Sequence, residues 1–110
     1  MAERQFDLWL EFEQWMPREG DDPEDDFFNM TVTLPDGKKY ALIVWTFKYM
    51  RRAVQKCRKS GEHLRGSYLP PPDLFVERLD RHLLESVVAD LITHQGLSPQ
   101  WEVQDETDAG

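Results

Sequence analysis

The apolar run YALIVW spans residues 40–45 without a polar interruption. Successive side chains of a strand point to opposite faces, so a strand made from this run has apolar side chains on both faces. We therefore expect a central strand that is covered on both sides. Residues 30–54 around it predict strand, turn, strand and helix, because Pro35-Asp36-Gly37 supplies a tight hairpin turn between two apolar runs.

Two alternating segments precede this hairpin turn. In residues 6–15 apolar and polar positions alternate, which predicts a half-buried strand that ends at Met16-Pro17. Residues 27–34 alternate in the same way and predict the second strand. The segment REGDDPEDD, residues 18–26, contains six acids, a glycine and a proline. Repulsion between its carboxylates and the central proline predict a loop.

Two helices are predicted after the hairpin. Thr46 is a suitable N-cap for the first helix, whose apolar positions repeat at helical spacing and which stops at Gly61. Residues 74–79 predict a fourth strand. Asp80 then caps a second helix with a wide apolar stripe, and Gly96 ends it.

The expected fold is therefore α+β, in the order β-β-β-α-β-α. We expect a three-stranded antiparallel meander, a fourth strand that makes the sheet mixed, and two helices packed on the sheet. Residues 1–110 are long enough for one domain with one core, and a flexible tail is expected from about residue 102. The predicted core residues are Leu8, Leu10, Phe12, Val32, Leu42, Val44, Val54, Val76, Leu84, Val87, Val88 and Leu91.

The charge is acidic overall and unevenly distributed. Thirteen Lys and Arg against 21 Asp and Glu give a net charge of -8. Residues 48–65 contain seven basic residues and one acid, so this window carries +6 and the rest of the chain -14. The acidic remainder disfavours approach to nucleic acid and favours a basic partner.

The sequence contains no recognisable catalytic or metal-binding motif. The three histidines have no ligand spacing, and Cys57 lies on the apolar stripe of its helix, where a buried structural thiol is expected. The acidic run lacks the ligand alternation and central glycine of a calcium loop, and no phosphate-binding or nucleophile motif occurs. We expect a non-enzymatic protein without cofactor or metal. With no signal peptide and no apolar stretch that could span a membrane, we expect it in the cytoplasm.

Acidic residues are the candidate partner-binding site. Two of them lie on the polar face of the first predicted strand, and six lie in the loop that follows it, so their carboxylates could form one patch. A solvated acidic loop without a partner is the equally supported alternative. The candidate residues are Glu11, Glu13, Glu19, Asp21, Asp22, Glu24, Asp25 and Asp26.

Three segments resemble small cytoplasmic bacterial proteins that serve as immunity partners in polymorphic-toxin systems. They are PDG at residues 35–37, YALIVWTF at 40–47 and PPDLFVE at 71–77. The resemblance implies a protein that neutralises a toxin by blocking its site, and it assigns no functional residue. Two alternatives remain open: an adaptor or structural subunit that forms a homodimer, and a nucleic-acid-associated protein that uses the basic helix.

Overall fold

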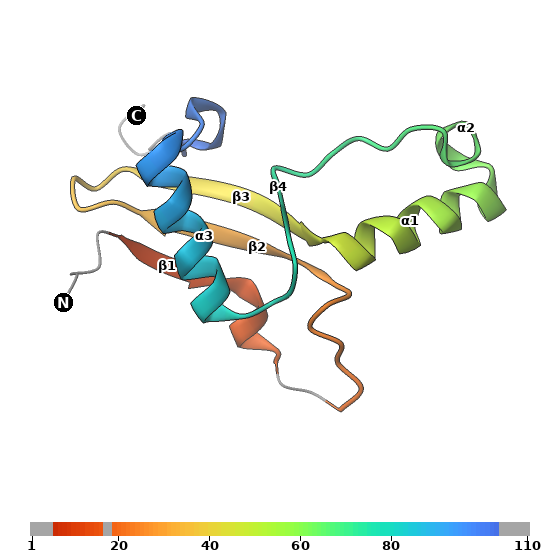
Figure 1. Cartoon of the computed structure of the whole chain (residues 1–110), viewed down its shortest axis with the longest axis horizontal. Coiled ribbons are helices and arrows are strands. Elements are labelled where there is room, and N and C mark those ends of the chain that lie inside the picture. Colours follow the sequence, from red (N-terminus) through yellow and green to blue (C-terminus); the bar gives the residue numbers. More distant parts are fainter. Residues whose placement is uncertain (1–5, 17–18, 104–110) are drawn as a thin grey trace, which may run out of the picture.

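Four strands form one mixed sheet in the spatial order β1-β2-β3-β4 (Figure 1). The computed structural model describes residues 6–16 and 19–103. Along the chain the elements are β1 (Asp7–Leu10), the 3₁₀ helix η1 (Glu11–Gln14), β2 (Phe27–Thr33), β3 (Lys39–Thr46), α1 (Phe47–Ser60), α2 (Glu62–Gly66), β4 (Leu74–Val76), α3 (Arg81–His94) and the 3₁₀ helix η2 (Pro99–Trp101). The α+β class is confirmed.

Antiparallel pairing does not extend to the fourth strand. β1 pairs with β2 and β2 with β3 in antiparallel register, whereas β4 runs parallel to β3 through three residue pairs. Parallel neighbours need a long crossover connection, which α1, α2 and the segment 67–73 provide. Asp73 aligns β4, because its N–H donates to the Ile43 carbonyl (3.0 Å) and its Oδ2 accepts from the Ile43 N–H (2.8 Å).

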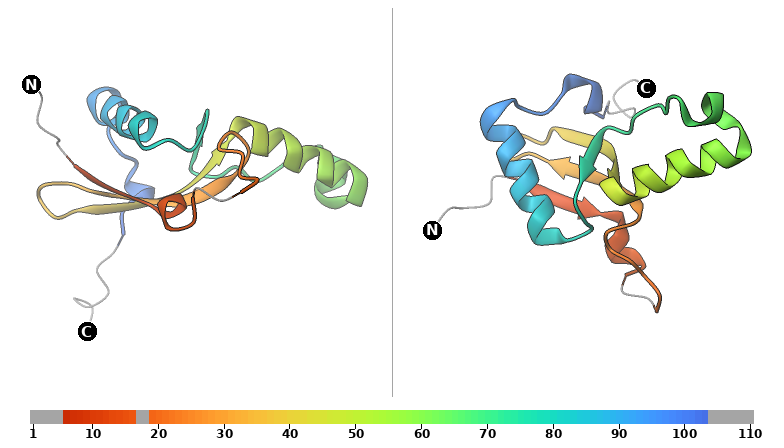
Figure 2. Two further views of the ribbon diagram at one scale, coloured as in Figure 1. Left: turned by 90° about the horizontal axis from the view of Figure 1, so that it is seen from below. Right: turned by 45° about the vertical axis from the view of Figure 1, so that its right-hand side comes forward.

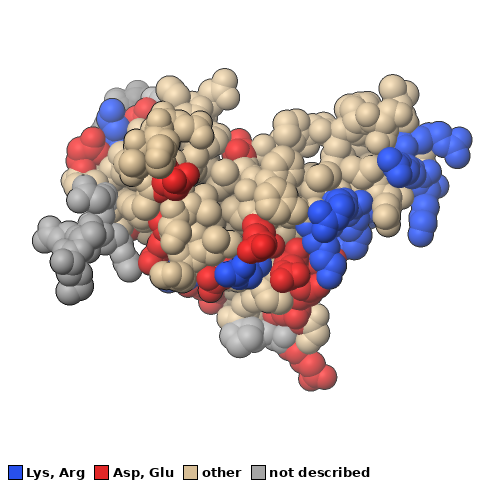
Figure 3. Space-filling model, in the orientation of Figure 1, with Lys and Arg blue, Asp and Glu red and all other residues tan. Residues whose placement is uncertain are grey.

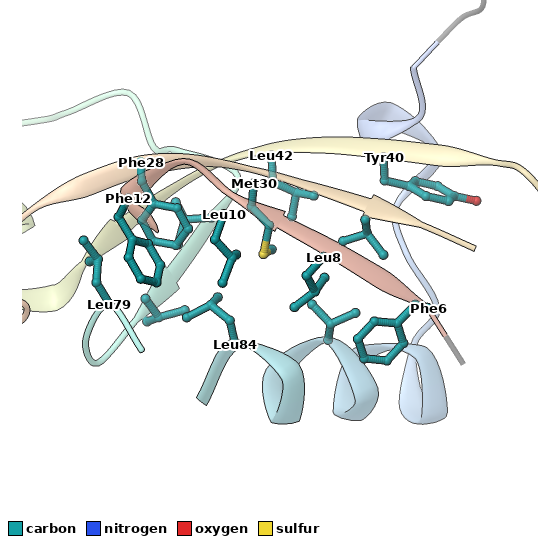
Figure 4. Close-up of a cluster of buried hydrophobic side chains, with 14 residues drawn as sticks. Phe6, Leu8, Leu10, Phe12, Phe28, Met30, Tyr40, Leu42, Leu79 and Leu84 are labelled. Atoms are coloured by element: carbon teal, nitrogen blue, oxygen red, sulfur yellow. The ribbon is translucent and has the colours of Figure 1, made fainter. Parts of the chain in front are cut away.

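The core lies between one face of the sheet and α3 (Figure 4). Every second residue of β1, β2 and β3 points toward α3, as the alternation of residues 6–15 and 27–34 predicted for β1 and β2. The predicted core residues that are buried are Leu8, Leu10, Phe12, Val32, Leu42, Val44, Val76, Leu84 and Val88. Val54, Val87 and Leu91 are only half-buried. The core also contains Phe6, Phe28, Met30, Tyr40 and Leu79.

The expectation that β3 is covered on both faces is wrong. Leu42 and Val44 are buried, but Ile43 between them is 47% exposed. The cause is the course of α1, which leaves the end of β3 and extends away from the sheet (Figures 1 and 2). α3 alone lies along the sheet among the described helices, so the prediction of two helices packed on the sheet is wrong for α1.

Residues 47–73 form a projection that we call the arm. Its helix α1 begins at Thr46, whose hydroxyl accepts the Tyr49 N–H (3.1 Å), and ends at the left-handed Gly61, as predicted. α2 folds back onto α1, and an added Cβ at Gly66 would come within 2.9 Å of the Val54 carbonyl oxygen. The radius of gyration of 16.0 Å exceeds the roughly 13 Å of a compact domain of this length, as expected for a projecting arm.

The first strand is shorter than predicted. β1 ends at Leu10, and residues 11–14 turn into η1. Two contacts favour this turn over a longer strand. The Phe12 ring packs edge-on against Phe28 in the core, with ring centroids 4.9 Å apart, and the Glu11 side chain bonds to Asn29 of β2.

The chain returns to the sheet after η2. Glu102 pairs with Tyr40, and the Val103 N–H donates to the Lys39 carbonyl (2.8 Å). Most of the tail predicted to be flexible, residues 104–110, lies outside the described residues. Within the described residues, no helix is both long and apolar enough to cross a membrane.

Candidate functional site

Glu11 does not lie on the polar face of a strand, as the sequence had suggested. Glu11 Oε1 accepts two hydrogen bonds from Asn29, one from its backbone N–H (2.8 Å) and one from its side-chain Nδ2 (3.0 Å). The carboxylate therefore continues the pairing between β1 and β2 by one residue beyond the end of β1. This role is structural.

Glu13 also faces a partner within the molecule. Its two carboxylate oxygens accept from Nε and Nη2 of Arg81, each at 2.8 Å. This hydrogen-bonded guanidinium lowers the pKa of the Glu13 carboxyl below its usual range. Arg81 Nη2 also donates to the Leu8 carbonyl (3.0 Å), so the pair connects η1, the edge of β1 and the first turn of α3.

Two acids of the loop at residues 19–26 pair with the base of the arm. Asp22 Oδ2 lies 2.8 Å from Lys48 Nζ, and the Asp25 carboxylate accepts Arg52 Nε at 2.9 and 3.0 Å. The Lys48 ammonium and then the Glu24 N–H, which also donates to this carboxylate, lower the pKa of Asp22. Part of the acidic charge is therefore balanced by the molecule's own basic helix.

The other loop acids have different surroundings. The Asp26 N–H donates to the Thr46 hydroxyl (3.1 Å), and its Oδ1 accepts the Phe27 N–H (2.8 Å). Asp21 is half-buried, whereas Glu19 and Glu24 are exposed. The structure thus brings the eight candidate residues to one end of β1 and β2, but it directs several of them toward the protein itself.

A different surface is open to a partner: the face of the sheet opposite α3, which we call the open face. Strand alternation places apolar side chains on it from β1, β2, β3 and β4, and α3 covers the other face of the sheet (Figure 2). Its strand residues include Trp9, Phe27, Ala41, Ile43, Trp45 and Phe75.

Aromatic contacts join the open face to the base of the arm. The Tyr49 ring lies 5.1 Å from both Phe27 and Trp45, and Phe47 stacks on Phe75 at 6.2 Å. The Arg52 guanidinium lies over the Tyr49 ring at 5.3 Å. These side chains form one aromatic cluster fixed to the sheet.

The exposed apolar area of the open face is comparable to that of apolar patches that are often functional. Trp9, Phe27, Ile43 and Phe47 are 46–48% exposed. At about 200 Å² for a large side chain, these four residues alone leave roughly 400 Å² of surface in water. The largest apolar patch of a typical monomer is about 300–600 Å² and is often functional.

Two patterns in the sequence come from this face, and we interpreted both of them differently. Trp9 occupies a polar position of the first alternating segment, and the apolar run at residues 40–45 has a second apolar face. Both patterns fit a surface covered by the protein itself as well as one covered by a partner. Only the direction of α1 distinguishes the two.

Within the described residues, the histidines and the cysteine do not belong to a group that could bind a metal ion. In residues 6–16 and 19–103, no group of three or more His, Cys, Asp and Glu could hold a metal ion. His94 Nδ1 lies 3.1 Å from Asp90 Oδ1 on the last turns of α3, and the His63 ring packs edge-on against Tyr68. Cys57 is a buried free thiol within the arm, as its position on the helix predicted.

Comparisons of the chain with protein-family models, with curated proteins and with solved structures found no match.

Proposed function

We propose that this chain is a non-enzymatic protein-binding domain, and that it acts as an immunity protein by covering the site of a toxin with its open face. The observation that carries the proposal is the set of four half-exposed large apolar side chains on this side of the sheet, Trp9, Phe27, Ile43 and Phe47. Tryptophan and other aromatic residues at the centre of a patch supply most of the binding energy in protein interfaces.

The rigidity of the open face supports this role. Trp9, Phe27 and Ile43 stand on paired strands, and the opposite face of those strands is the core. Such side chains lose little conformational freedom on binding, which leaves more of the contact energy for affinity. An acidic loop would lose more of its freedom when it orders against a partner.

The charge of the molecule favours a basic partner. Asp7 shares the strand face of Trp9, Glu19 and Glu24 are exposed, and the net charge is -8. Toxins that cut nucleic acids are commonly basic, so an acidic inhibitor approaches them quickly by electrostatic steering. In this proposal the open face provides the affinity for the partner, and the acidic residues raise the association rate.

A homodimer is the second candidate, and the same surface favours it. In a two-fold dimer the same patch of each copy meets the other, and the apolar open face could cover itself in this way. Sedimentation velocity separates the two functions. A stable dimer of the chain alone, lost on Trp9→Ser with Ile43→Ser, would favour the dimer over the immunity function.

The test combines capture with toxicity. A partner is captured from lysate of the native host on the wild-type chain and on the variant W9S/I43S, and the protein that only the wild type retains is then expressed alone. The proposal predicts that this protein arrests growth and that co-expressed wild type, but not W9S/I43S, restores it. The matched control E19Q/E24Q, which removes two exposed acids, should still restore growth. A harmless partner, or equal rescue by W9S/I43S, would refute the proposal.

A further inference from the structure

We infer that the arm is a nucleic-acid-binding element, separate from the open face, whose exposed cations contact the phosphate backbone. The arm carries seven basic residues, and two of them, Lys48 and Arg52, pair with the acidic loop. The other five are exposed, and within the described part of the chain no ion pair joins them to a carboxylate. These five residues, which we call the unpaired cations, are Arg51, Lys56, Arg58, Lys59 and Arg65.

Helical spacing places four of the unpaired cations on α1 within somewhat less than half of its circumference. At about 100° per residue, Arg51 and Arg58 lie nearly above each other, Lys59 lies about 80° round the helix from Arg51, and Lys56 lies about 140° round. The apolar side of the helix carries the buried Cys57. Because α1 extends away from the sheet beyond its first turn, the basic side of its outer part is accessible (Figure 1).

The projection of the arm weakens the objection raised by the acidic charge. Lys59 is eleven residues beyond Lys48, which corresponds to about 16 Å along a helix axis. Charges are screened over about 8 Å at physiological ionic strength. The acids that pair with Lys48 and Arg52 therefore barely affect the far end of α1. Figure 3 shows this separation: basic side chains gather along α1, and acidic side chains gather toward the loop.

The tip of the arm adds groups suited to contact with bases. His63, Leu64 and Arg65 have φ of 52°, 53° and 58°, a left-handed turn that side chains with a Cβ seldom adopt. Gly66 closes this turn against the Val54 carbonyl. Leu64 in this turn is 73% exposed, and Tyr68, whose ring packs edge-on against His63, is 55% exposed. An exposed aromatic ring beside cations can stack on an unpaired base.

The partner is identified by its phosphates, which both duplexes and single strands present. Fluorescence anisotropy is measured on labelled probes, about 20 nucleotides of dT and a mixed-sequence duplex of about 20 base pairs. Contacts to about five phosphates predict that raising NaCl from about 50 to about 200 mM weakens duplex binding roughly 500-fold and single-strand binding roughly 100-fold.

Two variants test the assignment. R51Q/K56Q/R58Q/K59Q/R65Q should bind both probes at least tenfold more weakly than wild type at low salt. The matched control K48Q/R52Q, at the base of the arm, should bind within about twofold of wild type, because these cations already pair with Asp22 and Asp25. Circular dichroism spectra and melting temperatures must match wild type for either result to count.

Two results would overturn the inference. One is equal binding of the probes by wild type and the five-site variant at low salt. The other is no binding of either probe by wild type at low salt. Wild type can then still dimerise in sedimentation velocity while the five-site variant is monomeric. In that case the arm binds the acidic body of a second copy.

Discussion

Arg81 contacts three elements through one side chain. It bonds to Glu13 of η1, to the Leu8 carbonyl at the edge of β1 and to Glu85 on its own helix. Of these contacts, only the one with Glu85 has the i,i+4 spacing that can be recognised in a sequence. Glu13 and Arg81 are 68 residues apart, and no local pattern couples them. This is why Glu13 looked like part of a binding site.

Glu13→Gln should lower stability at neutral pH but not in acid. The pKa of Glu13 is lowered on folding from a usual value of 4.5, so its contribution is present above pH 4.5 and is lost as the pH falls below that value. We expect a loss of up to about 1 kcal/mol at pH 7, since the pair is partly exposed. Urea titrations of both proteins at pH 7 and near pH 3 measure this, and an equal loss at both pH values would contradict it.

Gly66 packs so closely against α1 that a side chain at this position would clash. At Gly66→Ala the new Cβ would lie 2.9 Å from the Val54 carbonyl oxygen, in a residue with φ of 78°. We expect it to cost at least about 2 kcal/mol. The control is Gly37→Ala, which has φ of 92° but no atom within 4 Å and should cost about 1 kcal/mol. Similar melting temperatures for the two variants would mean that Gly66 does not pack against α1.

Among the elements, β3 and α1 show which features the local sequence pattern predicts and which it does not predict. The strand, the turn before it, the Thr46 cap and the Gly61 stop were all predicted from residues next to one another in sequence. The direction of α1 was not, because its apolar stripe can be covered by the sheet or, as found, by α2 and the arm itself. The parallel pairing of β4 likewise depends on contacts such as Asp73 with Ile43.

Adjacent residues of β3 give a direct test of its two faces. Leu42 is 2% exposed and points into the core, whereas Ile43 is 47% exposed on the open face. Leu42→Ala should therefore cost about 2–5 kcal/mol, and Ile43→Ala less than about 1 kcal/mol. Denaturant titration compares them. A larger loss for Ile43→Ala would mean that the open face is covered.

On the scale of the whole molecule, the chain separates an acidic body, a basic arm and an apolar sheet face. Composition predicted the first two, since the split between +6 and -14 is visible in the sequence. It could not predict that Asp22 and Asp25 pair with the arm, because Lys48 and Arg52 lie 26 and 27 residues away. Nor could it show that the strongest candidate surface for a partner is apolar.

The central claim is that the open face supplies the affinity for a protein partner. Its most direct measurement is the pair of rate constants for the captured partner with wild type, W9S/I43S and D21N/D22N/D25N/D26N, at low and high salt. The four-site variant should associate more slowly at low salt only. W9S/I43S should associate normally and dissociate at least about tenfold faster at both salt concentrations. If W9S/I43S dissociates from the partner at the same rate as wild type, the claim is contradicted.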